Sequence, residues 1–368
     1  MDNWRSLPIF INGRFLSQSV TGVQRYAEEV VKGLDSLLAA APGQGRPSSI
    51  TIVSPRNASR KLDLNAIRQV SGGFFNGHLW EQFSLPYLSR GGLLLSLCNT
   101  GPLVKSSHVV TIHDASVFGF PAAYSFAFCN WYRLLFWVLG RTARKVVTDS
   151  KFSKKELQRY CRIVPRKIKA IYLGSQHLKE IRSDDTIMKR HDLVRGSYVL
   201  AVSSLNPNKN FQAIADAILL LGSTAFKFVI AGAGNTRVFG RAELSLPPHV
   251  THVGYVSDEE LKALYENAAC FVYPSFYEGF GLPPLEAMTC GCPVIVSAAA
   301  SLPEVCGEAA LYCNPHDAAD IAEKIRRVMT DPELRIKMRA EGIERARVFS
   351  WEKCARELWG EIEMVLAR

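Results

Sequence analysis

Short apolar segments alternate with longer amphipathic segments along almost the whole chain, and this alternation constrains the fold most. In the first half, the pattern predicts strands at 8–13, 49–54, 93–98, 109–113, 145–148 and 168–173, and helices at about 23–41, 81–90 and 153–160. In the second half, it predicts strands at 199–203, 226–231, 250–253, 270–273 and 293–297, and helices at about 211–221, 258–267, 282–290 and 318–330. Apolar strands joined through helices form parallel sheets covered on both faces, so we expect an α/β protein.

The polar segment 177–197 separates the two runs of strands and is the best candidate for a linker. With 368 residues, 48% of them hydrophobic, the chain is large enough to bury two cores. We therefore expect two doubly wound domains with a cleft between them. The expected boundaries are residues 1–178 for the first domain, 179–350 for the second and 351–368 for a final helix.

The segment 275–288, which reads Ser-Phe-Tyr-Glu-Gly-Phe-Gly-Leu-Pro-Pro-Leu-Glu-Ala-Met, carries the clearest functional signal. It follows an expected buried strand and leads into an expected helix with two prolines in its first turn, where no amide donor is needed. Gly279 and Gly281 let the backbone turn tightly and approach a ligand. The start of the helix directs unpaired amides and the positive end of its dipole at one point, where a diphosphate is stabilised.

Two carboxylates accompany this loop, Glu278 within it and Glu286 about one turn into the helix. A carboxylate does not bind phosphate, but it accepts hydrogen bonds from hydroxyl groups, which a nucleotide sugar has in number. The segment therefore indicates an enzyme that uses a sugar nucleotide. An ordinary loop and a helix with a capping acid is the alternative interpretation.

Glu278 and Glu286 lie eight positions apart around Gly-Phe-Gly-Leu-Pro, which resembles the Glu-x7-Glu signature of the retaining family 4 glycosyltransferases. Further segments resemble the same family in the same order, namely 12–13 with 21–26, 111–114, 147–153, 198–210 and 349–351. The resemblance extends over nearly the whole chain. It implies the GT-B fold, in which two Rossmann-like domains face a central cleft and the final helix returns to the first domain.

The same resemblance implies roles for particular residues. Glu278 would hold the hydroxyls of the transferred sugar, Glu286 the ribose, and His113 the transferred sugar. The expected catalytic residues are His113, Lys209 and Glu278, and the expected donor-binding residues are Gly22, Ser204, Lys209, Gly232, Val256, Glu278, Gly279, Phe280, Gly281, Leu282 and Glu286. The family often has an arginine shortly before the lysine, where this chain has Ser203 and Ser204, so Ser204 would donate one hydrogen bond in its place.

Two of these residues also carry a signal of their own. Lys209 lies in a turn before an expected helix, where a cation can stabilise the charge that develops on a leaving diphosphate; a solvated lysine is the alternative. His113 ends an apolar strand and would project into the cleft, although a structural histidine fits the same position.

The chain contains no Asp-x-Asp, the carboxylate pair that commonly anchors a divalent metal in the other major glycosyltransferase fold. We therefore expect no metal and no cofactor besides the nucleotide sugar. Nine cysteines without a Cys-x-x-Cys pair indicate neither a zinc site nor a disulfide framework.

The resemblance to bacterial mannosyl- and rhamnosyltransferases of surface polysaccharide assembly makes GDP-mannose, or a GDP- or dTDP-deoxyhexose, the first expectation for the donor. A sugar-nucleotide epimerase of the same fold is the main alternative.

Positive charge is concentrated in the first half. Residues 1–180 hold 24 Lys and Arg against 10 Asp and Glu, and the chain totals of 44 and 34 leave 20 and 24 for the remainder. Eleven of the basic residues fall in 141–169, directly after the aromatic segment 126–137. Such a pairing suits an anionic lipid surface that carries a lipid-linked acceptor, but a core helix followed by a solvated basic helix fits equally well. We expect a cytoplasmic enzyme, with peripheral contact to the cytoplasmic membrane as one alternative and no nucleic-acid partner.

Overall fold

The computed structural model describes residues 7–40, 49–202, 206–232 and 249–367. The chain forms two compact units: unit 1 comprises residues 1–174 and 350–368, and unit 2 comprises residues 175–349. The change from unit 1 to unit 2 comes four residues before the expected boundary after residue 178.

Among its described residues, unit 1 has a seven-stranded sheet in which every pairing is parallel, in the order β3-β2-β1-β4-β5-β6-β7. The strands are β1 (Ile9–Asn12), β2 (Ile50–Ser54), β3 (Arg68–Ser71), β4 (Leu93–Ser96), β5 (His108–Thr111), β6 (Lys145–Thr148) and β7 (Ile168–Ala170). The helices are α1 (Gly22–Ala40), α2 (Gly77–Leu79), α3 (Leu85–Leu88), α4 (Ser116–Gly119), α5 (Phe126–Thr142), α6 (Lys151–Cys161) and α15 (Trp351–Leu366).

Unit 2 repeats this architecture with a six-stranded parallel sheet among its described residues, in the order β10-β9-β8-β11-β12-β13. The strands are β8 (Tyr198–Val202), β9 (Lys227–Ala231), β10 (Val250–Gly254), β11 (Cys270–Tyr273), β12 (Val294–Ser297) and β13 (Ala310–Cys313). The helices are α7 (His177–Glu180), α8 (Thr186–Arg190), α9 (Phe211–Leu221), α10 (Asp258–Asn267), α11 (Leu282–Thr289), α12 (Leu302–Cys306), α13 (Ala318–Thr330) and α14 (Pro332–Ala346).

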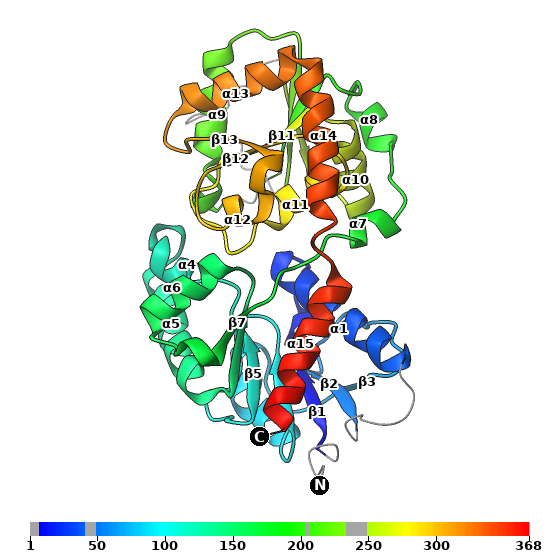
Figure 1. Cartoon of the computed structure of the whole chain (residues 1–368). Coiled ribbons are helices and arrows are strands. Elements are labelled where there is room, and N and C mark those ends of the chain that lie inside the picture. The colour runs from blue at the N-terminus through cyan, green and yellow to red at the C-terminus, as the bar shows by residue number, and fades with distance from the viewer. Residues whose placement is uncertain (1–6, 41–48, 203–205, 233–248, 368) are drawn as a thin grey trace. The chain divides into compact units, whose positions relative to one another are not determined.

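The last helix packs on the first helix of unit 1, and Figure 1 shows α1 and α15 side by side. Their backbones approach closely at Gly33, where a Cβ atom would lie 2.7 Å from the Cβ of Ala355. The rings of Tyr26 and Trp351 meet edge to face, with centroids 6.2 Å apart. Side chains of α5 and α6 bury the β5 and β6 part of the sheet in a separate apolar cluster. Both faces of this sheet are therefore covered, as the apolar strands predict.

Two expectations about local structure were wrong. The segment 177–197 is no free linker, because it forms α7 and α8 and belongs to unit 2; the apolar side chains of Leu178 and Ile187 are fully buried there. The expected helix at 81–90 starts earlier and is irregular, because a π-helical turn, Trp80–Ser84, joins α2 to α3. The strand β3 was missed because its residues are polar and mostly exposed.

The order of strands reverses once in each sheet, between β1 and β4 in unit 1 and between β8 and β11 in unit 2. In doubly wound sheets, ligands bind outside the carboxyl ends of the strands at such a switch point. The residues that follow these four strands are therefore the first to consider as a site.

Candidate functional site

At the switch point of unit 2, Lys209 forms an ion pair with Glu278. Lys209 ends the short turn Pro207–Lys209 after β8, and Glu278 lies in the loop after β11. The ammonium nitrogen lies 2.7 Å from Oε1 and 2.9 Å from Oε2 of the carboxylate. Because β8 and β11 are neighbours in the sheet, two residues that are 69 positions apart in the chain meet at one edge. Both belong to the expected donor site.

Hydrogen bonds from the same strand and loop fix this ion pair. Lys209 Nζ donates to the hydroxyl of Tyr273 at 2.6 Å, and Ser275 Oγ donates to Glu278 Oε1 at 2.5 Å. Burial, and then the charge of Glu278, raise the pKa of Tyr273 well above its usual value, so that this hydroxyl stays protonated. The ammonium thus has an acceptor for each of its three donors. A phosphate oxygen can replace one of these acceptors, because about a fifth of the Lys209 side chain is exposed.

The loop after Glu278 has the geometry that its glycines predict. Gly281 adopts a φ of +98°, and a Cβ atom there would lie 2.6 Å from Cδ2 of Leu302. Helix α11 starts at the next residue, Leu282, and has proline in its first turn. The side chain of Phe280 is buried and meets the ring of Phe349 edge to face, which anchors the loop in the interior of unit 2.

Glu286 lies in α11 and has a partner that the sequence did not indicate. Its Oε1 lies 3.1 Å from Nε2 of His177, and both side chains are buried. His177 begins α7, in the segment that was expected to be a linker. The hydrogen bond connects α7 to α11 and fixes the orientation of the Glu286 carboxylate.

The other expected donor residues of unit 2 follow neighbouring strands. Gly232 comes directly after β9 and donates its amide to the carbonyl of Gly254 at 2.8 Å. Val256 lies between β10 and α10. Ser204 lies outside the described residues. Since β10, β9, β8 and β11 are consecutive in the sheet, the described residues of the expected donor site in this unit share its carboxyl edge.

His113 lies in unit 1, just after β5, and is 4% exposed. Its Nδ1 lies 2.8 Å from Oδ2 of Asp149, and its Nε2 lies 3.0 Å from the carbonyl oxygen of Leu97. Burial on its own lowers the pKa of His113, but the carboxylate of Asp149 outweighs burial and the pKa is raised. Burial raises the pKa of Asp149. His113 is thus held inside unit 1 by both ring nitrogens, as the structural alternative describes; its role at the transferred sugar stays a prediction.

The sequence signal for Asp149 is its position directly after an expected strand, while its place beside His113 depends on the strand order. Asp149 follows β6, and β6 is the neighbour of β5 in the sheet, so the two strand ends place Asp149 beside His113. Gly22, the other expected donor residue of unit 1, begins α1, and a Cβ atom there would have no heavy atom within 4 Å.

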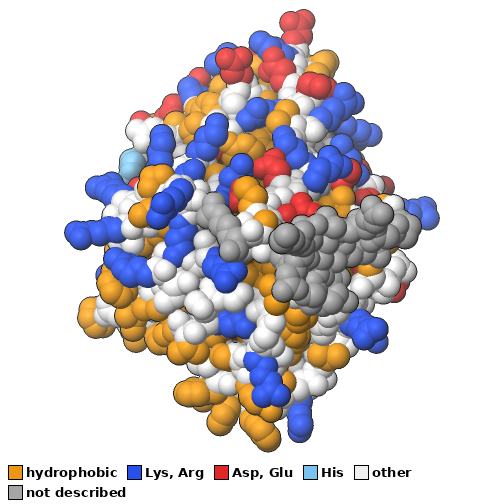
Figure 2. Space-filling view, turned by 60° about the horizontal axis from the view of Figure 1, so that its bottom comes forward, with side chains coloured by type: hydrophobic (Ala, Val, Ile, Leu, Met, Phe, Trp, Pro, Cys, Tyr) orange, Lys and Arg blue, Asp and Glu red, His pale blue; other side chains and the backbone are white. Residues whose placement is uncertain are grey.

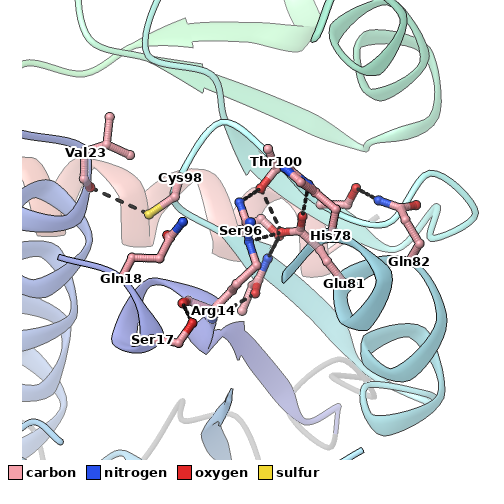
Figure 3. Close-up of polar contacts among 12 residues, drawn as sticks. Arg14, Ser17, Gln18, Val23, His78, Glu81, Gln82, Ser96, Cys98 and Thr100 are labelled. Carbon is pink, nitrogen blue, oxygen red and sulfur yellow. Dashed lines mark hydrogen bonds and ion pairs between the residues drawn. The ribbon is translucent and has the colours of Figure 1, made fainter. Parts of the chain in front are cut away.

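The switch point of unit 1 holds a buried polar cluster around Glu81, which we call the Glu81 cluster (Figure 3). Glu81 is 0% exposed and lies in the π-helical turn. Its Oε1 accepts hydrogen bonds from Asn12 at 2.6 Å and from Thr100 at 2.8 Å, and the guanidinium of Arg14 lies 3.5 Å away. Asn12 ends β1 and Thr100 follows β4, so this cluster occupies the reversal of strand order.

The electrostatics of the Glu81 cluster keep its carboxylate ionised. Burial on its own raises the pKa of Glu81, but His78, Arg14 and the hydrogen bonds outweigh it, so that the pKa is lowered. Oε2 of Glu81 has no hydrogen-bond partner among the described residues, and Nδ1 of His78 lies 3.4 Å from it. No sequence motif indicated this cluster, because its members come from separate segments. Its one sequence signal is the position of Asn12 and Thr100 just after two apolar strands.

Neither the cysteines nor a metal-ligand group adds a second candidate site. All nine cysteines are free thiols. Over the described ranges, no group of three or more His, Cys, Asp and Glu side chains is arranged to hold a metal ion. In the same ranges, no helix is both long enough and apolar enough to cross a bilayer.

Known sequences that are similar to this chain are glycosyltransferases. The family described as glycosyl transferases group 1 matches residues 183–345. The O-antigen chain mannosyltransferase B of Escherichia coli is 33% identical over 259 residues, which are 67% of this chain and 67% of that protein. The serotype-specific mannosyltransferase WbdA of Escherichia coli is 33% identical over 168 residues, which are 43% of this chain but only 20% of WbdA.

Solved structures show the same fold at low sequence identity. Sucrose-phosphate synthase from Thermosynechococcus elongatus is similar over 98% of this chain and 99% of its own, with a TM-score of 0.74 and 19% identity. HepE of Anabaena, solved with UDP and glucose, is similar over 98% of this chain and 100% of its own, with a TM-score of 0.71 and 14% identity. Two Rossmann-like domains of the GT-B type are thereby confirmed as the fold.

Proposed function

The chain belongs to the group 1 glycosyl transferases, and from this premise we propose that it transfers a mannosyl residue, or a related deoxyhexosyl residue, from a nucleotide-diphosphate sugar to a saccharide acceptor. That it is a glycosyltransferase follows from the family. The sugar is proposed because the two relatives described above are mannosyltransferases, one of them named for the O-antigen chain. The same names support an acceptor in bacterial surface polysaccharide assembly, free or linked to a lipid.

The observation that carries the proposal is the ion pair of Lys209 and Glu278 at the switch point of unit 2. A diphosphate needs a cation and backbone amides, and a hexose needs hydroxyl acceptors. Lys209 and the start of α11 supply the first set, and the carboxylate of Glu278 supplies the second. We assign the ribose hydroxyls to Glu286, through the carboxylate oxygen that does not contact His177.

We propose transfer with retention of the anomeric configuration. The acceptor oxygen forms its bond to the anomeric carbon on the face from which the nucleotide leaves. The bond from that carbon to the phosphate oxygen breaks, and the departing phosphate oxygen takes the acceptor proton. Lys209 stabilises the charge that develops on the diphosphate, so that this scheme requires no metal.

We place the acceptor in unit 1, at the Glu81 cluster. The proposal rests on the switch-point position of this cluster and on Oε2 of Glu81. Among the described residues this oxygen has no hydrogen-bond partner and only Nδ1 of His78 near it, at 3.4 Å, and an acceptor sugar is rich in donors. His113 would then position the transferred sugar only after one of its ring nitrogens leaves its present partner. A lipid-linked acceptor would further bring unit 1 to the cytoplasmic face of a membrane.

The experiment is an assay of purified protein with GDP-mannose, GDP- and dTDP-deoxyhexoses and UDP-glucose, preceded by a thermal-shift panel of GDP, UDP and dTDP. A ligand at a hundred times its dissociation constant stabilises by about 2.7 kcal/mol, which is easily measured. We expect GDP to stabilise most, and the NMR spectrum of the product to show the anomer of the donor. Inverted product would refute retention, and donor turnover without acceptor would favour the epimerase.

A further inference from the structure

Unit 1 contains a second candidate site, an open cavity of about 730 Å³. Its walls come from the start of β6, the turn before β7 and the last turns of α15. Four cationic side chains line it, against the single carboxylate of Glu361; the cations are Arg144, Lys145, Arg166 and Lys167. We refer to it as the basic cavity.

Three of the four cations in the basic cavity have no anionic partner among the described residues. The fourth, Lys145, pairs with Glu361, with 2.5 Å between the ammonium nitrogen and Oε2. In the same part of the chain, the side chains of Arg144 and Lys167 contact only backbone carbonyl oxygens, at 3.4 Å and 2.5 Å. Arg166 makes no side-chain hydrogen bond or ion pair with the described part of the chain. Burial, and then the nearby Arg141, lower the pKa of Lys167, so that an anion bound beside it would relieve repulsion.

The rim of the basic cavity is apolar and exposed. Val164 is 49% exposed and Met364 is 51% exposed. On α5, outside the lining of the cavity, Trp137 is 47% exposed and lies under the guanidinium of Arg141, 3.6 Å from its ring centroid. Figure 2 brings the lower end of the Figure 1 view forward and shows Lys and Arg side chains interspersed with exposed hydrophobic side chains over this face. A cationic interior with an apolar rim is complementary to a phosphate group attached to a hydrocarbon chain.

The basic cavity lies at the end of unit 1 opposite its switch point. Lys145 begins β6 at the cavity, and Asp149 follows the same strand beside His113. A strand rises about 3.3 Å per residue, so the two ends are separated by roughly 13 Å. A ligand in the basic cavity therefore attaches the protein without occupying the edge where an acceptor would react.

We propose that the basic cavity binds the phosphate group of a membrane lipid. Arg144 and Arg166 hold the phosphate oxygens, since a guanidinium presents planar paired donors that match phosphate, while Val164 and Met364 contact the start of the acyl chains. The inference rests on the proposed function only in that a lipid-linked acceptor gives the enzyme a reason to be at the membrane. On this proposal the basic cavity binds the anionic lipid, and the exposed basic residues of α6 contribute little to membrane binding.

The test is co-sedimentation of the full-length protein, without donor or acceptor, with vesicles of phosphatidylglycerol and phosphatidylcholine in equal parts and with phosphatidylcholine vesicles. The cavity variant is Arg144→Glu with Arg166→Glu. The matched control is Lys154→Glu with Lys155→Glu on α6, which changes the net charge equally outside the cavity. Calorimetric titration of the wild type and the cavity variant with inorganic phosphate and diphosphate, at constant ionic strength, tests whether the cavity binds soluble phosphate compounds instead of a lipid.

We expect the wild type to bind only the anionic vesicles. The affinity of the cavity variant for these vesicles should fall roughly tenfold or more, because each basic residue near an anionic surface contributes to the free energy of binding. The control should lose much less. Equal losses in both variants would show diffuse surface charge and overturn the site. Binding of soluble phosphate or diphosphate that the cavity variant loses, without vesicle binding by the wild type, would overturn the lipid assignment; the donor site of unit 2 contributes equally to both titrations. An unchanged nucleotide thermal shift in both variants shows that unit 2 is intact, and failure of the transfer assay does not affect these results.

Discussion

Both units have a parallel sheet with polar residues at its switch point, but these polar centres are built from different parts of the chain. In unit 2, the switch point is occupied by Lys209 and by a loop that is continuous in sequence from Ser275 to Glu278. In unit 1, the Glu81 cluster occupies the equivalent position, but its residues come from the ends of two strands and from a π-helical turn. The first centre is therefore visible as a motif, and the second becomes visible only in the folded chain.

The two centres also differ in how much charge they bury. Glu81 is fully buried beside Arg14, whereas Lys209 keeps about a fifth of its side chain exposed beside Glu278. Removing one partner of a buried ion pair costs more than removing one of an accessible pair, because the remaining charge is left without water. The unit 1 centre therefore stabilises the fold in addition to any role with an acceptor, whereas the unit 2 centre can exchange one of its contacts for a ligand.

The largest expected effect is on the stability of unit 1. Glu81→Ala leaves Arg14 buried without its carboxylate, which typically costs about 3–5 kcal/mol of unfolding free energy. Urea unfolding measures the change. Glu352→Ala is the control in the same unit, since Glu352 and its partner Arg356 are both well exposed, and such pairs contribute about 0–1 kcal/mol. Equal effects of the two substitutions would remove the distinction between the units.

The next effect is on catalysis in unit 2. Lys209→Ala should lower kcat by roughly a hundredfold or more, as loss of a pre-organised charge partner does, and EDTA should have little effect on the wild type. The control is Lys262→Ala, because Lys262 pairs with Glu266 on α10 at 3.8 Å, outside the switch point. Activity that EDTA abolishes and Mg²⁺ or Mn²⁺ restores would contradict the assignment of the leaving-group charge to Lys209.

Within unit 2, the two carboxylates should separate binding from turnover. Glu278→Ala should lower kcat, because Glu278 holds the reacting sugar, whereas Glu286→Ala should weaken nucleotide affinity, because the ribose is bound alike in ground and transition states. We expect about tenfold for the affinity change, as for the loss of one good hydrogen-bonded contact to a charged group. Nucleotide titration and steady-state kinetics measure the two. If both substitutions raise KM alone, the division of roles is wrong.

The smallest expected effect is on the pH dependence of unit 1. The raised pKa of His113 means that its contribution to stability is complete below the unfolded pKa, about 6.5, and is lost as pH rises through the folded value. Urea unfolding should thus show lower stability at pH 8.5 than at pH 6. Asp149→Asn should flatten this slope, and a steep slope in that variant would point to other groups.

The fold class and the polar centre of unit 2 could be predicted from the amino-acid sequence alone. Strand and helix periods depend on local sequence, and parallel order follows from the helices between strands, so the two doubly wound sheets were predictable. The loop from Ser275 to Gly281 was predictable because its glycines, prolines and carboxylate act within a few residues of one another. Lys209 could be named as a candidate because it follows a strand in a recognisable turn; its role stays a prediction.

Which side chains contact one another could not be predicted from the sequence. His177 meets Glu286 across 109 positions, and Asn12 meets Glu81 across 69, and no local period encodes either contact. The basic segment 141–169 read as one charged stretch, but folding divided it between the surface of α6 and the basic cavity, whose remaining wall is the C-terminal helix. Which side chains meet depends on the order of the strands and on helices that come from a distant part of the chain. Both are set when the sheet and its helices pack together, not by the local sequence.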